Sequence, residues 1–157
     1  MIPTSTTKAS RAAPFLACAV SVVLAAPALA AQPLTLTPAP VKAQAVDGSF
    51  RLTAATRIHV AKGDVEARGV AVQLSELLHR TRGVRPAVVE GEPAVGEAAI
   101  SLVRGGADGE GYGLDVAPGG VKITALKRAG LFYGAISLWQ LAVQDEAKGP
   151  VDVPAAK

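Results

Sequence analysis

The run RAGLFYGAISLWQL, residues 128 to 141, constrains the fold more than any other stretch, because it is strongly apolar and contains the only Trp. A membrane-spanning helix needs about 20 apolar residues. Only 15 residues separate Arg128 from the polar cluster that begins at Gln144. The run therefore predicts a helix inside a globular domain, and the Gly-x-x-x-Gly of Gly130 and Gly134 is not interpreted as a membrane pairing motif.

As a helix, this run has an apolar arc wider than one sheet would cover. Phe132, Ile136 and Trp139 share one face at a spacing of 3.6 residues, and further apolar residues widen that face. An arc of this width favours burial on two sides. We expect one side to pack on the domain's own sheet and the other on a second domain, and we assign to that interdomain packing Leu131, Leu138, Trp139 and Ala142.

Residues 1–30 have the pattern of a signal peptide. A short basic lead precedes an apolar run and the small-x-small sequence Ala28-Leu29-Ala30, which predicts cleavage after Ala30 and a periplasmic or secreted protein with no membrane span after processing. Cleavage would remove Cys18, the only cysteine, so no disulfide is expected. It would also lower the basic side chains from 16 to 14, against 13 acidic ones, which gives no support to nucleic-acid binding.

Beyond this peptide the sequence predicts an α+β domain. We divide the chain into an extended lead-in (31–48), an α/β domain (49–146) and a linker (147–157). Within the domain, period-2 and period-3.6 patterns predict one mixed or antiparallel β-sheet with two helices packed on one face. The expected strands are 50–52, 57–60, 85–89, 99–103, 112–116 and 121–125, and the expected helices are 65–80, with Asp64 as N-cap and Gly83 as stop signal, and 128–141.

No catalytic, cofactor-binding or metal-ligating residue is expected. The glycines of RGGADGEG, residues 104–111, lie between two strands rather than before a helix, and so predict a hairpin turn instead of a phosphate loop. His59 and His79 lack a partner at metal-ligand spacing and are interpreted as half-exposed surface residues. Asp108, Glu110 and Asp115 are interpreted as solvated residues rather than a glycosidase carboxylate pair.

The stretch EGYGLDVAPGGVKITALKRAGLFYGAISLWQL, residues 110–141, resembles the non-catalytic N-terminal domain of glycoside hydrolase family 20, the β-N-acetylhexosaminidases. That domain has a zincin-like layered fold. Its motifs E-x-Y-x-L-x-V, G-V-x-I-x-A, A-G-x-F-Y-G and S-L-x-Q-L are all present, beginning at Glu110, Gly120, Ala129 and Ser137. The resemblance covers about residues 34–153.

The resemblance implies an accessory role. In the family the chemistry belongs to a (β/α)8 barrel that follows this domain, where an Asp-Glu pair supports attack by the 2-acetamido group of the substrate. That pair has no counterpart in this sequence, so the chain alone is expected to be inactive. Its expected partner is a C-terminal barrel, and N-acetylated glycans would be engaged through that barrel.

Two other interpretations remain open at the level of sequence. One is a free-standing periplasmic carbohydrate-binding or interaction module, for which Trp139 would be the only Trp able to stack on a sugar. The other is a degenerate zincin-like peptidase, which the lack of a metal motif disfavours.

Overall fold

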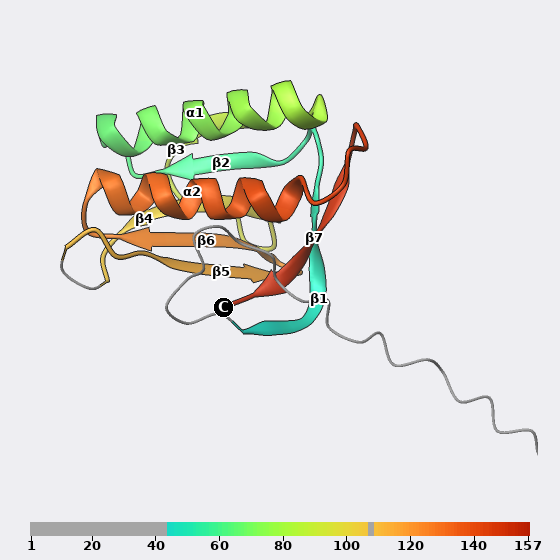
Figure 1. Cartoon of the computed structure of the whole chain (residues 1–157). Helices are drawn as coiled ribbons and strands as arrows, with labels where there is room; N and C mark the ends of the chain where they lie inside the picture. The colour runs from blue at the N-terminus through green and yellow to red at the C-terminus, as the bar shows by residue number, and fades with distance from the viewer. Residues whose placement is uncertain (1–43, 107–108) are drawn as a thin grey trace, which may run out of the picture.

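The structure is a computed structural model and describes residues 44–106 and 109–157. In these ranges the chain forms seven strands and two helices (Figure 1). In chain order they are β1 (Ala45–Leu52), β2 (Arg57–Val60), α1 (Val65–Arg82), β3 (Ala87–Glu90), β4 (Ala99–Arg104), β5 (Gly113–Ala117), β6 (Gly120–Ala125), α2 (Arg128–Ala142) and β7 (Val151–Ala156).

The strands form one mixed sheet in the order β1-β7-β5-β6-β4-β2-β3. β3, β2, β4 and β6 run parallel to one another, whereas β5, β7 and β1 join the sheet through antiparallel pairs. The hairpin expected from residues 112–125 is confirmed as β5 and β6, with Leu114 opposite Ile123 and Val116 opposite Val121.

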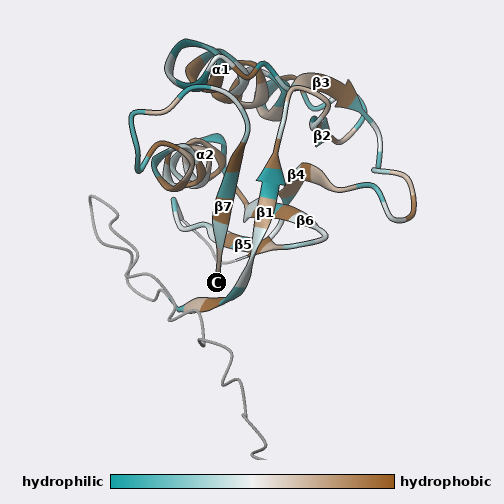
Figure 2. Ribbon diagram, turned by 90° about the vertical axis from the view of Figure 1, so that its right-hand side faces the viewer, coloured by the Kyte–Doolittle hydropathy of each residue, from teal (hydrophilic) through white to brown (hydrophobic). Residues whose placement is uncertain are grey.

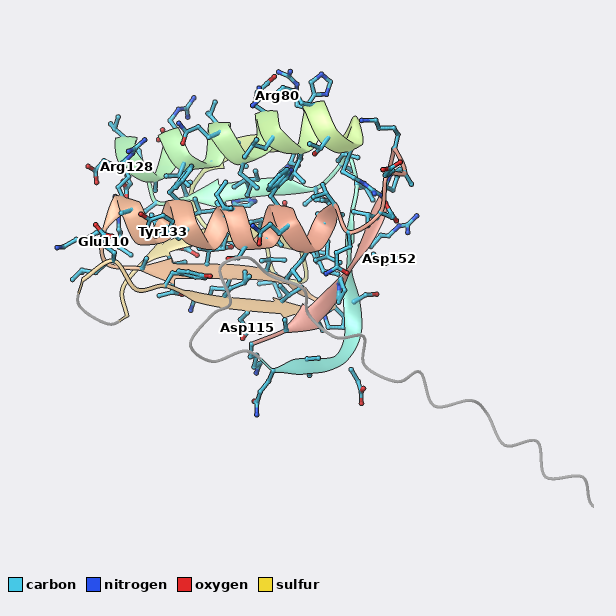
Figure 3. The ribbon with its side chains drawn as sticks, viewed as in Figure 1. Arg80, Glu110, Asp115, Arg128, Tyr133 and Asp152 are labelled. Atoms are coloured by element: carbon cyan, nitrogen blue, oxygen red, sulfur yellow. The ribbon has the colours of Figure 1, made fainter. Side chains whose placement is uncertain are left out.

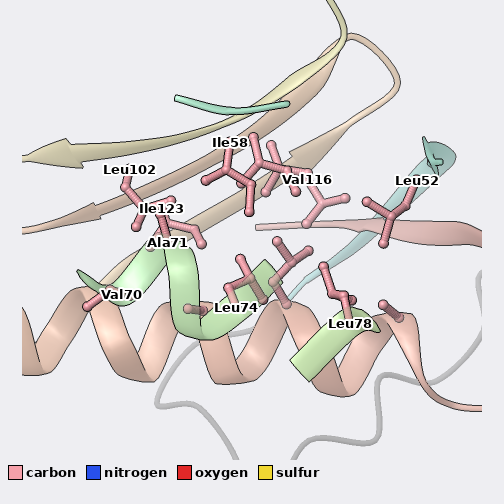
Figure 4. Packing of buried hydrophobic residues seen from close by; sticks show 14 of the residues in the cluster. Leu52, Ile58, Val70, Ala71, Leu74, Leu78, Leu102, Val116 and Ile123 are labelled. Carbon is pink, nitrogen blue, oxygen red and sulfur yellow. The ribbon is translucent and has the colours of Figure 1, made fainter. Parts of the chain in front are cut away.

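Both helices lie on the same face of the sheet, as expected (Figure 2). α1 covers β2, β3 and β4, and α2 covers β5, β6 and β7. Alternate strand residues point into this layer, since side chains along a strand alternate between the two faces. The core between the helices and the sheet (Figure 4) is built mainly from fully buried branched side chains and one Phe: Phe50, Leu52, Ile58, Val60, Val70, Leu74, Leu78, Ile100, Ile123, Leu131, Leu138 and Leu141.

The ends of α1 follow the expected signals. The Asp64 carboxylate accepts a hydrogen bond from the Ala67 backbone N–H at 2.9 Å, which caps the first turn. Gly83 stops the helix in the left-handed conformation at φ 74°, and its N–H donates to the His79 carbonyl. The helix is two residues longer than expected and ends at Arg82.

The linker expected over residues 147–157 is wrong for residues 151–156, which form β7 inside the sheet. Val153 is fully buried, and Val151 and Val153 lie opposite Leu52 and Phe50 of β1. Pro154 misled the prediction, because proline is unusual in a paired strand. It pairs with Ser49 beside an irregularity in the β1 register, where a ladder hydrogen bond can be missing. The lead-in also ends earlier than residue 48, because β1 begins at Ala45.

Two connections differ from expectation. The glycine-rich segment after β4 is not a hairpin turn, because β6 lies between β4 and β5 in the sheet. The connection from β3 back to β4, residues 91–98, crosses β2 on the face without helices. Connections between parallel strands are right-handed. The connection from β2 to β3 runs outward through α1 on the helical face, so a right-handed return from β3 to β4 must run on the other face. This loop buries His59, which is only 7 % exposed, so the expectation of a half-exposed His59 is wrong.

Candidate interdomain surface on the second helix

α2 approaches the sheet closely at its two glycines. A Cβ at Gly134 would lie 2.5 Å from Ile123 Cγ2, and one at Gly130 would lie 2.6 Å from the Gly111 carbonyl oxygen. One turn after Gly134, Ser137 Oγ and the Tyr112 hydroxyl share a hydrogen bond of 2.6 Å. The Gly-x-x-x-Gly spacing therefore marks the side of α2 that packs on β5 and β6.

The opposite side of α2 carries an apolar stripe that is only partly covered. We call the outer stripe the set of residues Ala129, Phe132, Tyr133 and Ile136, together with Val143 directly after the helix; the polar Gln140 lies on the same face. Tyr133 is 46 % exposed, and its ring packs against the Phe132 ring in a tilted arrangement with ring centroids 6.0 Å apart. Arg128 and Tyr133 are labelled along this helix in Figure 3. The spacing of three and four residues places the stripe on one face of the helix.

The interdomain residues expected from the sequence are not those of the outer stripe. Leu131, Leu138 and Ala142 are 0 % exposed and belong to the chain's own core, so their assignment to interdomain packing is wrong. The error arose because hydrophobicity alone does not say which side of an apolar helix meets the sheet. Gly130 and Gly134 were the signal that could have identified it, because a helix approaches a sheet most closely where side chains are missing.

Trp139 lies at the border between the two sides. Its ring is half-buried against the core, and its Nε1–H donates to Thr81 Oγ1 at 3.1 Å. Thr81 in turn donates to the Leu77 carbonyl at 2.7 Å. Trp139 therefore joins α2 to the last turn of α1.

The charges at the ends of α2 do not favour the helix by themselves. Lys127 and Arg128 are exposed at its N-terminus, and no side chain caps that end. Asp145 and Glu146 follow its C-terminus, so both ends have the sign that the helix dipole disfavours. α2 consequently depends on tertiary packing, as most protein helices do.

Two of the acidic residues considered in the sequence, Asp115 and Glu110, are described by the structure and lie on different segments. Asp115 lies on β5, and its carboxylate is 3.9 Å from Lys157 Nζ. Glu110 is exposed in the loop before β5, and Asp108 lies outside the described residues. His79 is exposed on α1. Within the residues described, no group of three or more His, Cys, Asp or Glu side chains is placed to hold a metal ion.

Neither helix of the described part of the chain is long and apolar enough to cross a membrane. The expected signal peptide, residues 1–30, lies outside that part.

Comparison with known proteins identifies the family. The sequence profile of glycosyl hydrolase family 20, domain 2, matches residues 34–157. None of the curated proteins searched matches the chain. Among solved structures, the GH20 β-N-acetylhexosaminidase of Streptomyces coelicolor A3(2) shares 34 % sequence identity at a TM-score of 0.61, over 76 % of this chain and 25 % of that chain.

Two further structures are similar. The N-acetyl-β-hexosaminidase of Streptomyces plicatus, solved with Thio-NAglucal, is 37 % identical at a TM-score of 0.62, over 76 % of this chain and 24 % of that chain. The chitobiase of Flavobacterium johnsoniae is 23 % identical at a TM-score of 0.58, over 76 % of this chain and 19 % of that chain, and shows the fold alone. The chain thus spans about a quarter of the length of the two Streptomyces enzymes. It belongs to glycosyl hydrolase family 20, as the accessory domain that is domain 2 of the family.

Proposed function

We propose that this chain is the non-catalytic domain of an exported β-N-acetylhexosaminidase and that it packs against the catalytic (β/α)8 barrel of the same protein. In this account the complete protein removes terminal N-acetylhexosamine residues, and the present domain supports the barrel without contacting the sugar. Two findings support the proposal: the family match over residues 34–157 and the similarity to Streptomyces enzymes, of which the matched part covers only about a quarter.

The observation that carries the packing is the outer stripe of α2. Tyr133 is exposed, and Phe132 and Ile136 are only half-buried, on a helix whose other side fills the core. A helix that is apolar all round is normally buried on both sides. The largely apolar outer stripe fits the surface of a second domain better than it fits a sugar ring.

The domain is also proposed to reach the periplasm or the medium through the Sec pathway. The basis is the pattern of residues 1–30, with Ala28-Leu29-Ala30 before the cleavage point. N-terminal sequencing of the exported protein, expected to begin at Ala31, checks this step.

A free-standing carbohydrate-binding module is less well supported. Trp139, the only Trp, packs against the core and is held by Thr81, so it does not form an open stacking platform.

Activity measurements test whether hydrolysis requires the catalytic barrel in addition to this chain. The chain 1–157 is expected not to hydrolyse a p-nitrophenyl N-acetylglucosaminide, because the Asp-Glu pair of the family has no counterpart in its sequence. The complete protein with its barrel is expected to be active and to lose thermal stability on Y133E, because Tyr133 is 46 % exposed in this chain and the change places a charge in the proposed interface. V72E is the matched control, since Val72 is 50 % exposed on α1. Turnover by the purified chain alone would contradict the proposal, as would equal effects of the two variants.

A further inference from the structure

The loop of residues 91–98 lies on the helix-free face of the sheet, and the buried side chain of His59 contacts both of its ends. Its Nδ1 lies 3.0 Å from the Gly91 carbonyl oxygen, at the start of the loop. Its Nε2 lies 3.2 Å from Glu97 Oε1, near the end of the loop. The ring therefore connects both ends of the loop to the middle of β2.

Both ring nitrogens face atoms that can only accept a hydrogen bond. A carbonyl oxygen has no proton to donate, and neither has an ionised carboxylate. Glu97 is held in its ionised form, because the Ala94 N–H at 2.9 Å, the His59 ring and the nearby Arg57 guanidinium keep the pKa of this carboxyl below its usual value. A neutral imidazole has one N–H, whereas an imidazolium has two. Only the charged ring can make both bonds.

The strand neighbours of the ring carry no charge that would replace the Glu97 carboxylate. In the sheet, His59 lies beside Val89 of β3 and Ser101 of β4, which are uncharged. Charged or titratable groups on this face and in the loop include Arg57 on β2, Glu92 and Glu97 in the loop, Lys122 on β6, which is the register partner of Ser101, and Asp115 on β5, opposite Lys122. Lys122 is exposed and lies two strands from His59.

We propose that His59 and Glu97 form a pH-sensitive latch, which holds the loop of residues 91–98 over the helix-free sheet face fully only while the His59 ring is charged. Because the two bonds need both ring N–H groups, the full stabilisation is present only while the ring carries its second proton, so it is weaker in mildly alkaline than in mildly acidic solution. It is also lost in stronger acid, when the Glu97 carboxylate takes up a proton. The latch goes beyond the proposed accessory function and does not depend on it.

Hydrogen exchange of the loop tests the latch in the whole chain. Protection factors for peptides covering residues 91–98 are compared at pH 5.5 and pH 8.0, after correction for the intrinsic exchange rate. We expect protection in the wild type to fall by about fivefold at the higher pH, the change that corresponds to one hydrogen bond. H79Q is the matched control, because His79 is the other histidine and is exposed on α1. It is expected to behave as wild type.

E97Q gives the sharper test and leaves His59 in place. The Gln amide oxygen can still accept from the Ala94 N–H, while its NH2 group replaces Oε1 and can donate to Nε2 of a neutral ring. E97Q is therefore expected to keep the loop protected at pH 8.0. Equal protection of the wild-type loop at both pH values would overturn the proposal, and so would an E97Q loop that loses protection as the wild type does.

Discussion

At the residue scale, the position of α2 is set by Gly130 and Gly134, which have no side chain where the helix meets the sheet. A methyl group at Gly134 would contact Ile123 and the Tyr112 ring. Ile123 is fully buried, and the Tyr112 hydroxyl is bonded to Ser137, so neither neighbour can yield easily. Gly69, by contrast, lies in α1 with no heavy atom within 4 Å of its would-be Cβ.

These two glycines give a matched pair of substitutions. G134A is expected to lower the free energy of unfolding by about 1–3 kcal/mol, because it overpacks the core. G69A is expected to raise it by about 0.5–1 kcal/mol, because alanine restricts the unfolded chain and favours a helix. Urea denaturation measures both changes. Stabilisation of the domain by G134A would show that α2 does not lie as close to the sheet as described.

At the scale of elements, α1 is anchored at each end by contacts with other segments. At its start, Arg104 at the end of β4 bonds the Asp64 carboxylate through Nε at 2.7 Å and Nη2 at 3.0 Å. At its end, the segment after α2 covers the last carbonyl groups of the helix. The Gly149 N–H donates to the Arg82 carbonyl at 2.6 Å, and Lys148 Nζ donates to the Thr81 carbonyl at 2.6 Å. Buried Arg82 also pairs with Asp145.

The ion pair at the start of α1 predicts a loss of stability in acid. The hydrogen bond from Arg104 is the main reason why the pKa of Asp64 falls from 3.8 to about 2. A lowered carboxyl pKa stabilises the fold above the unfolded value, and this stabilisation is lost as pH falls through the folded value. D64N keeps a capping residue but removes the charge. It is expected to cost about 2 kcal/mol at pH 7 and progressively less between pH 4 and pH 2.

Chemical denaturation of D64N and wild type across that pH range measures the effect. E66Q is the control, since Glu66 also contacts Arg104, at 2.9 Å, but its side chain is 63 % exposed. An exposed ion pair contributes little, so E66Q should follow the wild-type curve closely. A stability difference between D64N and wild type that does not change with pH would contradict the role of the Asp64 charge.

At the scale of the whole molecule, the sequence predicted the fold class, both helices and the β5–β6 hairpin, because these depend on local periodicity. It failed where pairing partners decide the structure. β7 has one buried valine, one partly buried valine and a proline, and only β1 and β5, far away in the sequence, make it a strand. His59 looked like a surface residue because the loop that buries it crosses the sheet from β3.

The expectation that α2 packs on a second domain stays a prediction, and the outward-facing residues of α2 differ from those named for it. The sequence indicated an apolar arc too wide for one sheet, and the structure retains an apolar stripe on the outside of α2. It did not indicate which residues would be covered, because Leu131 and Leu138 are as hydrophobic as Phe132 and Ile136. Gly130 and Gly134 indicate which side of the helix meets the sheet, because the helix can approach the sheet this closely only where side chains are missing.

The central claim, that the outer stripe of α2 packs on a catalytic barrel, is tested most directly by hydroxyl-radical footprinting of Tyr133. The chain 1–157 is compared with the complete protein that carries the barrel. Tyr133 is 46 % exposed in the chain described here and should be labelled readily, whereas in the complete protein we expect strong protection. Val95, fully exposed in the loop on the opposite sheet face, should be labelled equally in both. Equal labelling of Tyr133 in the two proteins would contradict the claim.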